Sequence, residues 1–423
     1  MNAATYSSTF KPQLRKDIVF GPPECTGGAT VYYMKDTFTN WFYKVGVREH
    51  FLVSRMDGSK TLQQISTEYA LQFGYHLDDH IWTGLFKLLE KRQMLMSTAD
   101  SAKLEELKSA AERKRRTGNR GLLRRRFQLV NPDAFLVKLL PWTLFAFRPA
   151  FVISALLVTA VLEVFVILNI KGIGIDAWDA RKNTLTVVLF FGLTWLFAAF
   201  HELAHGLACK KFGGSVREIG IIWRYLTFFP YCKLDDVVLF HNRRHQVYAA
   251  FAGTFVSFLT LLPFGLCWWF APVKSSGREL SALFLILFNC TCLINFLPFI
   301  ELDGYFMLSH ALGMIGLRKD SHQCWQKMLS KVLFKKGQGI AGYEPLSKYV
   351  YMVYGFFSFA FTTLFLAAML FYWLTVFRYW LGDVVVWSIL IVAALFLLYR
   401  ETGKSWVKKA FPALPLRKGS IPK

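Results

Sequence analysis

Two histidines and a glutamate stand within five residues of this chain, in the run His201-Glu202-Leu203-Ala204-His205. In an α-helix, positions i and i+4 lie only about 40° apart around the axis and one turn apart along it. His201 and His205 could therefore bind one metal ion together. Glu202 points roughly a quarter-turn away, so it could act as general base toward a water at the metal, which is the arrangement of zinc hydrolases.

The residues around this motif are those of a membrane-spanning helix. Residues 184–200 read TLTVVLFFGLTWLFAAF, and four more small or apolar residues follow the motif before the first lysines. A purely structural role is the alternative for the three polar side chains, but each costs at least a few kcal/mol at that depth. The motif therefore predicts a metal site inside the membrane.

The composition excludes an ordinary soluble protein. Of the 423 residues, 54% are hydrophobic and 41 are Phe, more than soluble domains carry. Because a bilayer core needs about 20 apolar residues per helix, we predict six spans at roughly 149–170, 184–209, 247–271, 281–300, 349–376 and 379–399. The first 17 residues contain no apolar segment, so we expect no cleavable signal peptide and a cytoplasmic N-terminal segment.

The positions of the 50 Lys and Arg residues predict the orientation of the chain in the membrane. Residues 1–148 carry 23 of them, and 210–245, 308–348 and the tail from residue 400 carry 7 each, whereas the connections on the other side carry 3, 2 and 1. Both termini are therefore predicted to be cytoplasmic. His201 lies about 25 Å along its span in a core about 30 Å thick, so the metal site is expected in the cytoplasmic third of the membrane.

Two histidines leave a catalytic zinc ion one protein ligand short, because such sites use three protein ligands and water. The end of the fourth predicted span supplies candidates in the run NFLPFIELDG, residues 295–304. Glu301 and Asp303 each offer a carboxylate there, on the predicted cytoplasmic side. Irregular backbone buried among helices can present such a ligand at membrane depth.

The HELAH motif in one span, followed by N-x-x-P-x-x-x-x-D-G at the end of a later one, resembles the site-2 protease family of intramembrane zinc metalloproteases. The resemblance covers roughly residues 145–400. It implies that Asp303 is the third zinc ligand and that Asn295 contacts the substrate or the transition state. The family's A-G-P before an Asn is here Ala-Gly-Thr-Phe-Val-Ser, residues 252–257, so substrate contacts made by those positions are not carried over.

The segment 216–230 between the second and third spans is rich in β-branched and aromatic residues with glycine breaks. It resembles the family's membrane-dipping β-hairpin, whose edge can pair with an unwound peptide substrate by strand addition. The alternative is an amphipathic interfacial loop anchored by Trp223 and Tyr225.

Several further polar residues could take part in chemistry. Glu163 lies inside the first predicted span without an evident partner, and a membrane carboxylate is a functional candidate by default. It could line a water route to the metal, but a place near the outer interface is the simpler interpretation. Other possible ligands, expected instead to belong to a solvated and positively charged loop, are Asp235, Asp236, His241 and His245.

The seven cysteines form no C-x-x-C pair, and most lie in predicted spans or on the cytoplasmic side. Disulfides are rare there, so we interpret the cysteines as small apolar packing residues.

Residues 10–98, the main part of the predicted domain 1–100, have a soluble composition. Thr61-Leu-Gln-Gln64 is a capping box followed by Leu62, Ile65 and Tyr69 at helical spacing, and a second amphipathic helix starts near Asp78 and contains Ile81, Leu85, Leu88 and Leu89. The order of short strands, an Asp-Gly turn and helices resembles the PqqD-type winged helix, which binds a leader peptide along a strand edge in peptide-maturation systems. We therefore expect this part to dock a peptide or a partner.

The basic residues between 113 and 126 belong to a linker and juxtamembrane segment, 101–148. A nucleic-acid role would need a helix that enters a groove, and glycines interrupt the run. Attraction to anionic membrane lipids, worth roughly 1 kcal/mol per charge near the surface, explains it more simply. A solvated linker is the alternative, and no nucleic-acid partner is expected.

Together these features predict a polytopic α-helical membrane protein with about six transmembrane helices, a membrane-associated β-hairpin and a small cytoplasmic α+β winged-helix-like N-terminal domain. The domains are 1–100, the linker 101–148, a transmembrane zinc metalloprotease domain 149–400 and a basic cytoplasmic tail 401–423. The predicted location is a prokaryotic inner (cytoplasmic) membrane.

The predicted function is zinc-dependent hydrolysis of a peptide bond in or near the membrane, with Zn2+ held by His201, His205 and Asp303 and with Glu202 as the base. The substrate would be a peptide or a membrane protein, and a transporter or peptide-maturation partner would fit the N-terminal domain. Two alternatives remain: a zinc hydrolase of a lipid or lipidated molecule, and a non-catalytic export or maturation accessory that binds peptide.

Overall fold

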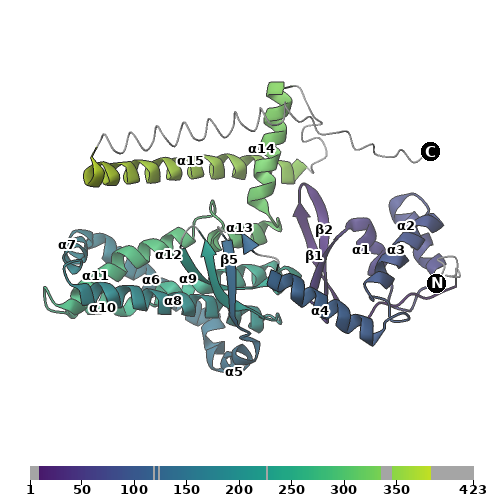
Figure 1. The fold of residues 1–423 in the computed structure, drawn as a ribbon, viewed down its shortest axis with the longest axis horizontal. Helices are drawn as coiled ribbons and strands as arrows, with labels where there is room; N and C mark the ends of the chain where they lie inside the picture. The colour runs from purple at the N-terminus through teal and green to yellow at the C-terminus, as the bar shows by residue number, and fades with distance from the viewer. Residues whose placement is uncertain (1–8, 118–119, 122–123, 225–226, 335–344, 383–423) are drawn as a thin grey trace. The chain divides into compact units, whose positions relative to one another are not determined.

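The computed structural model describes residues 9–117, 120–121, 124–224, 227–334 and 345–382 (Figure 1). The chain divides into two compact units, Met1–Ser358 and Phe359–Lys423. The first unit holds the N-terminal domain and the predicted metal ligands. The described part of the second unit is the remainder of one long helix.

The N-terminal domain contains a three-stranded antiparallel sheet in the order β1-β2-β3, which is seen with its helices in Figure 1. Its strands are β1 (Ile18–Thr26), β2 (Ala29–Asp36) and β3 (Trp41–Gly46). The helices are α1 (Val47–Val53), α2 (Leu62–Phe73) and α3 (Asp79–Lys91). The α+β content agrees with the prediction, whereas the winged-helix resemblance remains a prediction.

Helix α2 begins with the predicted capping box. The Thr61 hydroxyl accepts a hydrogen bond from the N–H of Gln64, and the side-chain oxygen of Gln64 accepts one from the N–H of Thr61. These two bonds satisfy donors that the first turn of a helix otherwise leaves open. The apolar residues at helical spacing behind the cap, Leu62, Ile65 and Tyr69, are buried as expected.

The predicted apolar face of α3 is wrong by about one residue. Leu89 is buried as predicted and Leu85 packs against the core, but Ile81 and Leu88 are exposed, and the helix buries Trp82 and Phe86 in their place. The reason is size: Trp82 and Phe86 stack on each other with ring centroids 5.8 Å apart, and aromatic side chains bury more apolar area than the aliphatic ones they displace.

The segment 101–148, predicted as a linker, contains regular structure. Helix α4 (Ser101–Thr117) is followed by β4 (Arg120–Gly121), β5 (Arg124–Val130), α5 (Asp133–Thr143) and the short 3-10 helix η1 (Leu144–Phe147). Strand β5 pairs with β6 (Ile219–Arg224), which pairs with β7 (Thr227–Cys232). The predicted hairpin, β6-β7, is therefore one half of a four-stranded antiparallel sheet in the order β4-β5-β6-β7, with β7 at its edge.

The rest of the described chain is almost entirely helical. Its elements are α6 (Pro149–Leu168), α7 (Ile170–Ala180), α8 (Thr184–Lys211), η2 (Asp235–Leu239), α9 (Arg243–Leu259), α10 (Leu262–Phe270), α11 (Ser276–Leu283), the π-helical turn η3 (Phe284–Phe288), α12 (Asn289–Asn295), α13 (Asp303–Leu312), α14 (Leu317–Phe334) and α15 (Pro345–Leu381).

Five helices of the described chain are long and apolar enough to cross a membrane. They are Pro149–Leu168, Thr184–Lys211, Arg243–Phe270, Ser276–Asn295 and Pro345–Ala368, which match the first five predicted spans. The predicted break between residues 376 and 379 is wrong, because α15 continues to Leu381 through a sequence without Pro or Gly after Gly355. The remainder of the sixth predicted span, from 383 onward, lies outside the described residues.

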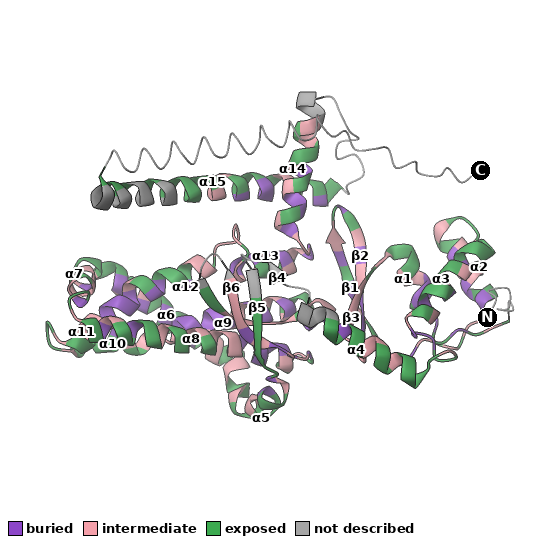
Figure 2. Ribbon diagram, viewed as in Figure 1, coloured by how far each residue is buried: buried purple, intermediate pink, exposed green. Residues whose placement is uncertain are grey.

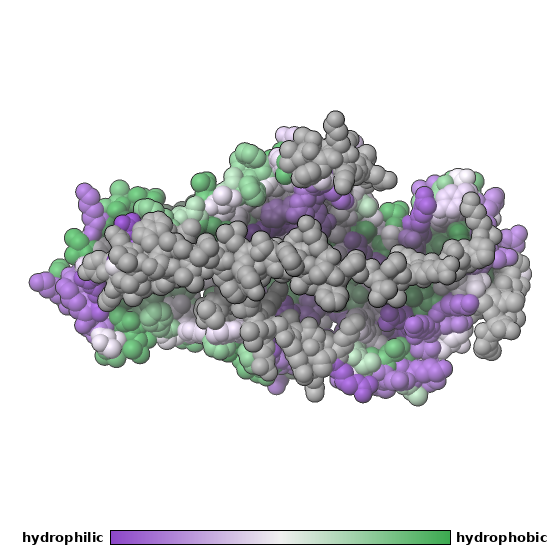
Figure 3. Space-filling view, turned by 45° about the horizontal axis from the view of Figure 1, so that its top comes forward, coloured by the Kyte–Doolittle hydropathy of each residue, from purple (hydrophilic) through white to green (hydrophobic). Residues whose placement is uncertain are grey.

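These helices expose large apolar side chains, as a membrane protein must. On α6 alone, Leu157, Val161 and Leu168 are 64%, 70% and 79% exposed, and Figure 2 shows the outward faces of α6, α8 and α10 in green. In Figure 3 hydrophobic residues lie on the surface over these helices at left. A soluble monomer rarely exposes apolar patches of this extent, so we interpret this surface as lipid-facing.

Between the helices, aromatic rings fill the core. Phe190, Phe197, Phe264 and Phe288 each pack against Phe284, with ring centroids 4.0 to 5.5 Å apart. Such ring pairs contribute about 0.5–1.5 kcal/mol each beyond the area they bury. This aromatic cluster lies between α8 and the η3 turn and so fixes the helix that carries the HELAH motif.

Glu163 has a partner that the sequence did not reveal. The side-chain amide of the buried Asn289, the first residue of α12, donates to its Oε2 at 3.0 Å. The pair joins the first span to the fourth within the bundle. This contact gives Glu163 a structural role and leaves the water-route hypothesis untested.

The N-terminal sheet contacts the helical part along β1 and the turn after it. The N–H of Cys25 donates to the carbonyl of Gly313, at the end of α13, at 2.7 Å. The N–H of Gly27 donates to Asp320 on α14 at 2.6 Å, and Arg243 at the start of α9 donates to the carbonyl of Pro23. The β1–β2 hairpin therefore contacts three helices of the C-terminal part at once.

Candidate metal centre

Helix α8 places the two histidines one turn apart, as the sequence predicts. The Nε2 atoms of His201 and His205 lie 3.1 Å apart, and both side chains are largely buried. The helix is long enough to carry them because it begins with a proper cap, in which Asn183 accepts the N–H of Thr186, and contains neither Pro nor a run of polar residues before the motif.

Asp303 completes a group of three ligand atoms. It is the first residue of α13 and lies directly after the irregular stretch that follows α12. Its Oδ2 is 3.2 Å from Nε2 of His201, and its Oδ1 is 3.3 Å from Nε2 of His205. All ligand atoms of the triad lie within 4.8 Å of one another.

The triad fits a zinc ion by distance and by chemistry. Four ligands at about 2.0–2.1 Å in a tetrahedron stand about 3.3 Å from one another. The two Nε2 atoms here are 3.1 Å apart, and each has one of the two Asp303 oxygens at 3.2 or 3.3 Å. Two imidazoles and one carboxylate are a ligand set that zinc accepts, with a fourth position left for water. The donor set alone does not distinguish zinc from other divalent transition metals.

The backbone that presents Asp303 is held in place from α15 and by a close approach. The Tyr354 hydroxyl donates to the carbonyl of Pro298 at 2.8 Å, and the Ser358 hydroxyl donates to that of Phe299 at 3.4 Å. A Cβ atom at Gly304 would collide with the carbonyl of Phe296. This collision explains why glycine follows Asp303 in the sequence motif.

Helix α9 orients both imidazole rings. Nδ1 of His205 lies 2.7 Å from the carbonyl oxygen of Ala249, and Nδ1 of His201 lies 2.9 Å from the Ser257 hydroxyl. A carbonyl oxygen only accepts, so Nδ1 of His205 must carry the proton and Nε2 has the lone pair that a metal needs. Such contacts fix both the tautomer and the ring orientation of metal-binding histidines.

The same helix approaches the triad closely at Gly253 and Thr254. A Cβ atom at Gly253 would lie 2.7 Å from Nε2 of His201 and closer still to Nε2 of His205. The Thr254 hydroxyl donates to Oδ2 of Asp303 at 2.5 Å. Only a residue without a side chain fits at position 253.

Glu202 lies beside the triad rather than in it. Its carboxylate interacts electrostatically with His201, His205 and Asp303, and the backbone N–H of Cys232, the last residue of β7, lies close enough to interact with it. It is partly buried. This is the place that a general base needs, next to the metal ligands but not one of them.

The other two residues of the second motif have different positions. Asn295 is the last residue of α12 and is half-buried, and no hydrogen bond joins its side chain to the triad in the described part of the chain. Glu301, the alternative third ligand, is exposed and is not part of the cluster. The geometry therefore favours Asp303, and the substrate contact of Asn295 remains a prediction.

The sheet next to α8 is tied to the end of that helix by Asp133, from α5. Its Oδ1 accepts the N–H of Val216 at 2.8 Å and the ammonium of Lys210 at 3.0 Å. Burial alone would raise the pKa of the Asp133 carboxyl, but these two donors and the nearby Arg217 hold it below its ordinary value. The charged form of Asp133 therefore connects α5, the end of α8 and the chain just before β6.

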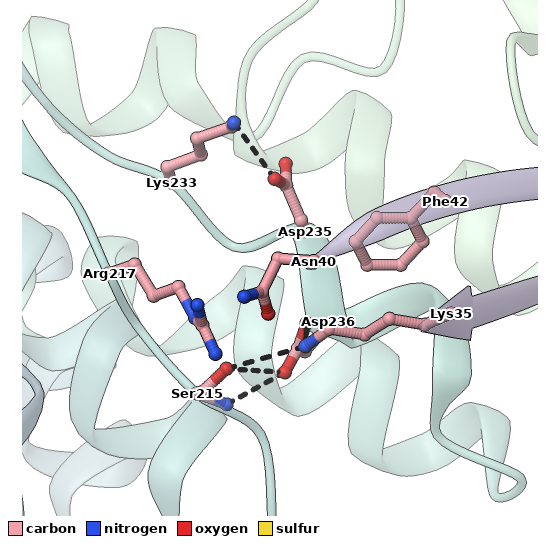
Figure 4. Close-up of a pocket in the computed structure, with 8 residues that line it drawn as sticks. All are labelled: Lys35, Asn40, Phe42, Ser215, Arg217, Lys233, Asp235 and Asp236. Atoms are coloured by element: carbon pink, nitrogen blue, oxygen red, sulfur yellow. Dashed lines mark hydrogen bonds and ion pairs between the residues drawn. The ribbon is translucent and has the colours of Figure 1, made fainter. Parts of the chain in front are cut away.

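The polar residues after the hairpin serve contacts within the protein. Asp236 pairs with Lys35 of β2 at 2.5 Å and also accepts the N–H and hydroxyl of Ser215, and Asp235 pairs with Lys233 at 2.9 Å. Figure 4 shows these side chains around a small polar pocket between β2, β3 and the chain before η2. His245 stacks on Phe212 with ring centroids 4.2 Å apart.

All seven cysteines are free, and three of them are buried. The interpretation of these residues as thiols that pack in the interior agrees with this arrangement at Cys209, Cys292 and Cys324, whereas Cys267 and Cys290 are exposed.

Sequence reasoning missed two parts of the site. The first is β5, although the alternation Arg126-Phe127-Gln128-Leu129 is the period of a strand. The second is the set of contacts made by Ala249, Thr254 and Ser257. These residues lie on one side of α9, but they have no metal-binding signature of their own. Only the packing of α9 against α8 and α13 reveals their role.

Comparison with known proteins yields no match: no protein-family model, no curated protein and no solved structure is significantly similar to this chain.

Proposed function

We propose that this protein is a zinc metalloendopeptidase of the site-2 protease type, which hydrolyses a peptide bond in or near a prokaryotic inner membrane with both termini in the cytoplasm. One observation carries the proposal: the ligand atoms of His201, His205 and Asp303 lie within 4.8 Å of one another, the two histidines stand on a helix of membrane-spanning composition, and Glu202 is beside them. A structural metal site would have no use for a base at that position.

The residues have separate roles in the proposed reaction. Zn2+, when bound by the triad, supplies a Lewis acid that polarises the scissile carbonyl and lowers the pKa of a water. Glu202 accepts the proton of that water and passes it to the nitrogen of the leaving amine. The nearby N–H of Cys232 is proposed to hold the carboxylate in place for both transfers, and Asn295 is proposed to orient the substrate backbone.

The position of β7 as an edge strand among the described residues favours a peptide over a lipid as substrate. β7 pairs with β6 on one side, and the other edge of β6 is occupied by β5. Pro230 has no N–H, and the N–H of Lys233 bonds to the carbonyl of Glu218 on the β6 side. Successive backbone N–H groups of a strand point alternately to its two sides, so the N–H groups of Phe228 and Cys232 point away from β6.

A substrate strand that pairs along this edge would therefore lie next to Glu202, because Cys232 already contacts that carboxylate. Strand addition of this kind gives affinity through main-chain hydrogen bonds without requiring a particular sequence. A lipid would use no strand edge. The predicted N-terminal docking domain fits a peptide or membrane-protein substrate and a transporter or maturation partner.

The proposal is tested with the full chain purified in detergent. Glu202→Gln should keep about one zinc per chain but lose cleavage of co-expressed single-span membrane reporters, whereas His201→Ala and Asp303→Ala should lose both zinc and cleavage. Glu301→Gln is the matched control and should retain both. Full cleavage by Glu202→Gln would refute the mechanism, and zinc retained by both ligand variants would refute the site.

The two alternatives give different results in the same experiment. A lipid hydrolase would cleave no reporter but would release fatty acid from phospholipid vesicles in a manner that depends on Glu202. A non-catalytic accessory would bind zinc and show neither activity.

A further inference from the structure

Each predicted metal ligand has a second hydrogen-bonding partner, and all three partners lie on α9. Ala249 and Ser257 serve the imidazoles of His205 and His201, and Thr254 serves the carboxylate of Asp303. The first two contacts orient the imidazole rings, and the carbonyl of Ala249 also sets the tautomer of His205. The third has a different effect, because a carboxylate has two oxygens and either or both can bind a metal.

Thr254 is completely buried, and its hydroxyl donates to Oδ2 of Asp303 at 2.5 Å. A carboxylate that binds a metal only accepts hydrogen bonds, so the hydroxyl must be the donor. Hydrogen bonds to an ionised acceptor are short and strong. Each oxygen of Asp303 lies near one imidazole, Oδ2 at 3.2 Å from Nε2 of His201 and Oδ1 at 3.3 Å from Nε2 of His205, but the hydroxyl bond engages electron density on Oδ2 alone.

We propose that Thr254 is a positioning residue of the metal centre. It orients the carboxylate of Asp303 so that Oδ1 is presented to the metal while Oδ2 is held by the hydroxyl, and this keeps the fourth coordination position available to water. The inference rests on the proposed metal site, since it assigns a role toward that metal.

The alternative to this role is a hydroxyl that only fills the interior. Buried threonines in membrane helices commonly satisfy their hydroxyl on their own helix, as Thr159 does by donating to the carbonyl of Ala155 on α6. Thr254 instead donates across to another element, to the one carboxylate of the triad. In the A-G-P pattern of the family that the sequence resembles, this position is Pro, which has no hydroxyl.

The test compares Thr254→Val, which has the same shape without the hydroxyl, with Thr254→Ser, which restores it. Thr159→Val is the matched control. The full chain, stripped of metal in detergent, is titrated with zinc against a fluorescent chelator and with Co2+ by visible absorption. We expect Thr254→Val to bind zinc about 10- to 100-fold more weakly and to show an altered Co2+ spectrum, with Thr254→Ser and Thr159→Val close to the parent chain.

The inference would be overturned if Thr254→Val had the zinc affinity and the Co2+ spectrum of the parent chain. It would also be overturned if Thr254→Ser lost as much zinc affinity as Thr254→Val. If Thr254→Val does not give a monodisperse protein, Thr254→Cys, with a weak S–H donor of similar size, replaces it and should show an intermediate affinity. A separate result would refute the proposed metal site itself, namely undiminished zinc binding by His201→Ala and Asp303→Ala.

Discussion

The backbone N–H of Cys232, at the end of β7, lies close enough to the carboxylate of Glu202 in the HELAH motif to interact with it. The contact joins the edge of a sheet to the predicted catalytic base. Any strand that extended the sheet at this edge would have its backbone within reach of the base and the triad.

The first prediction concerns this edge. Phe228→Pro removes an outward N–H without disturbing the pairing of β6 with β7, since Pro is tolerated on an edge strand. One lost hydrogen bond is worth about 0.5–1.5 kcal/mol, so the KM for a peptide substrate should rise roughly 2- to 10-fold at unchanged zinc content. Steady-state kinetics on a cleaved reporter measure this.

Phe229→Pro is the contrasting variant, because the N–H at 229 points toward β6 by the same alternation. Phe229→Pro should lower the amount of folded protein as well as the rate of reporter cleavage. Unchanged kinetics in Phe228→Pro, together with hydrolysis of lipid vesicles, would indicate a lipid substrate.

The second prediction concerns Gly253. In Gly253→Ala the new methyl group would occupy space next to the two Nε2 atoms of the histidines, so zinc binding should be lost even though Ala favours a helix. Metal content by mass spectrometry checks it. Gly192→Ala, at a position on α8 with open space around it, should bind zinc normally, and an unaffected Gly253→Ala would contradict the geometry of the site.

The third prediction concerns the ion pair between Lys35 and Asp236, whose side chains are 4% and 12% exposed. Removing one partner of a buried pair costs about 3–5 kcal/mol, so Lys35→Met should lower the thermal unfolding midpoint, with Lys44→Met on the exposed face of β3 as control. The double variant Lys35→Met with Asp236→Asn should recover part of the loss. A double variant less stable than Lys35→Met would refute this account.

The fourth prediction is a pH dependence at Glu24, on β1. Its side chain is 1% exposed, and burial raises the pKa of its carboxyl, partly offset by the amide of Gln246 and the charge of Arg243. The folded protein therefore holds this proton more tightly than the unfolded chain does, whose pKa is about 4.3. Its contribution to stability is greatest below that value, falls as the pH rises to the folded pKa, and stays low above it.

Glu24→Gln removes this dependence and should raise the unfolding midpoint at pH 7 relative to the parent chain, with little difference at pH 4. Differential scanning fluorimetry across this range measures both. Glu106→Gln, on an exposed position of α4, should leave the profile unchanged. A Glu24→Gln chain that is less stable at pH 7 would show that the charge is favourable where it lies.

The sequence was sufficient for the features that depend on local spacing. The i, i+4 histidines, the cap at Thr61 and the apolar length of five helices all follow from residues close together in the chain. The approach of Asp303 to His201 was predicted only through a resemblance, because a separation of about a hundred residues carries no periodic signal of its own.

Features that depend on packing between distant segments were not predictable in this way. The strand β5 takes its place only because β6 offers an edge, and the face of α3 is decided by which aromatic side chains fit the interior. In the sequence Thr254 and Ser257 look like ordinary residues of an apolar helix. Their role is visible only in the fold, where α8 and α13 place the triad next to them. In each case the determining interaction is absent from the local sequence.

Helix α13 has Asp303 at its first residue, and just past its last residue the carbonyl of Gly313 accepts a hydrogen bond from Cys25. A helix of ten residues is a stiff rod about 15 Å long. The β1–β2 hairpin therefore contacts one end of this rigid helix, and the predicted metal ligand Asp303 lies at the other end. A partner that pulls on the N-terminal domain would act mechanically on the geometry of the triad, and a truncated chain without that domain would lose the support of this rod.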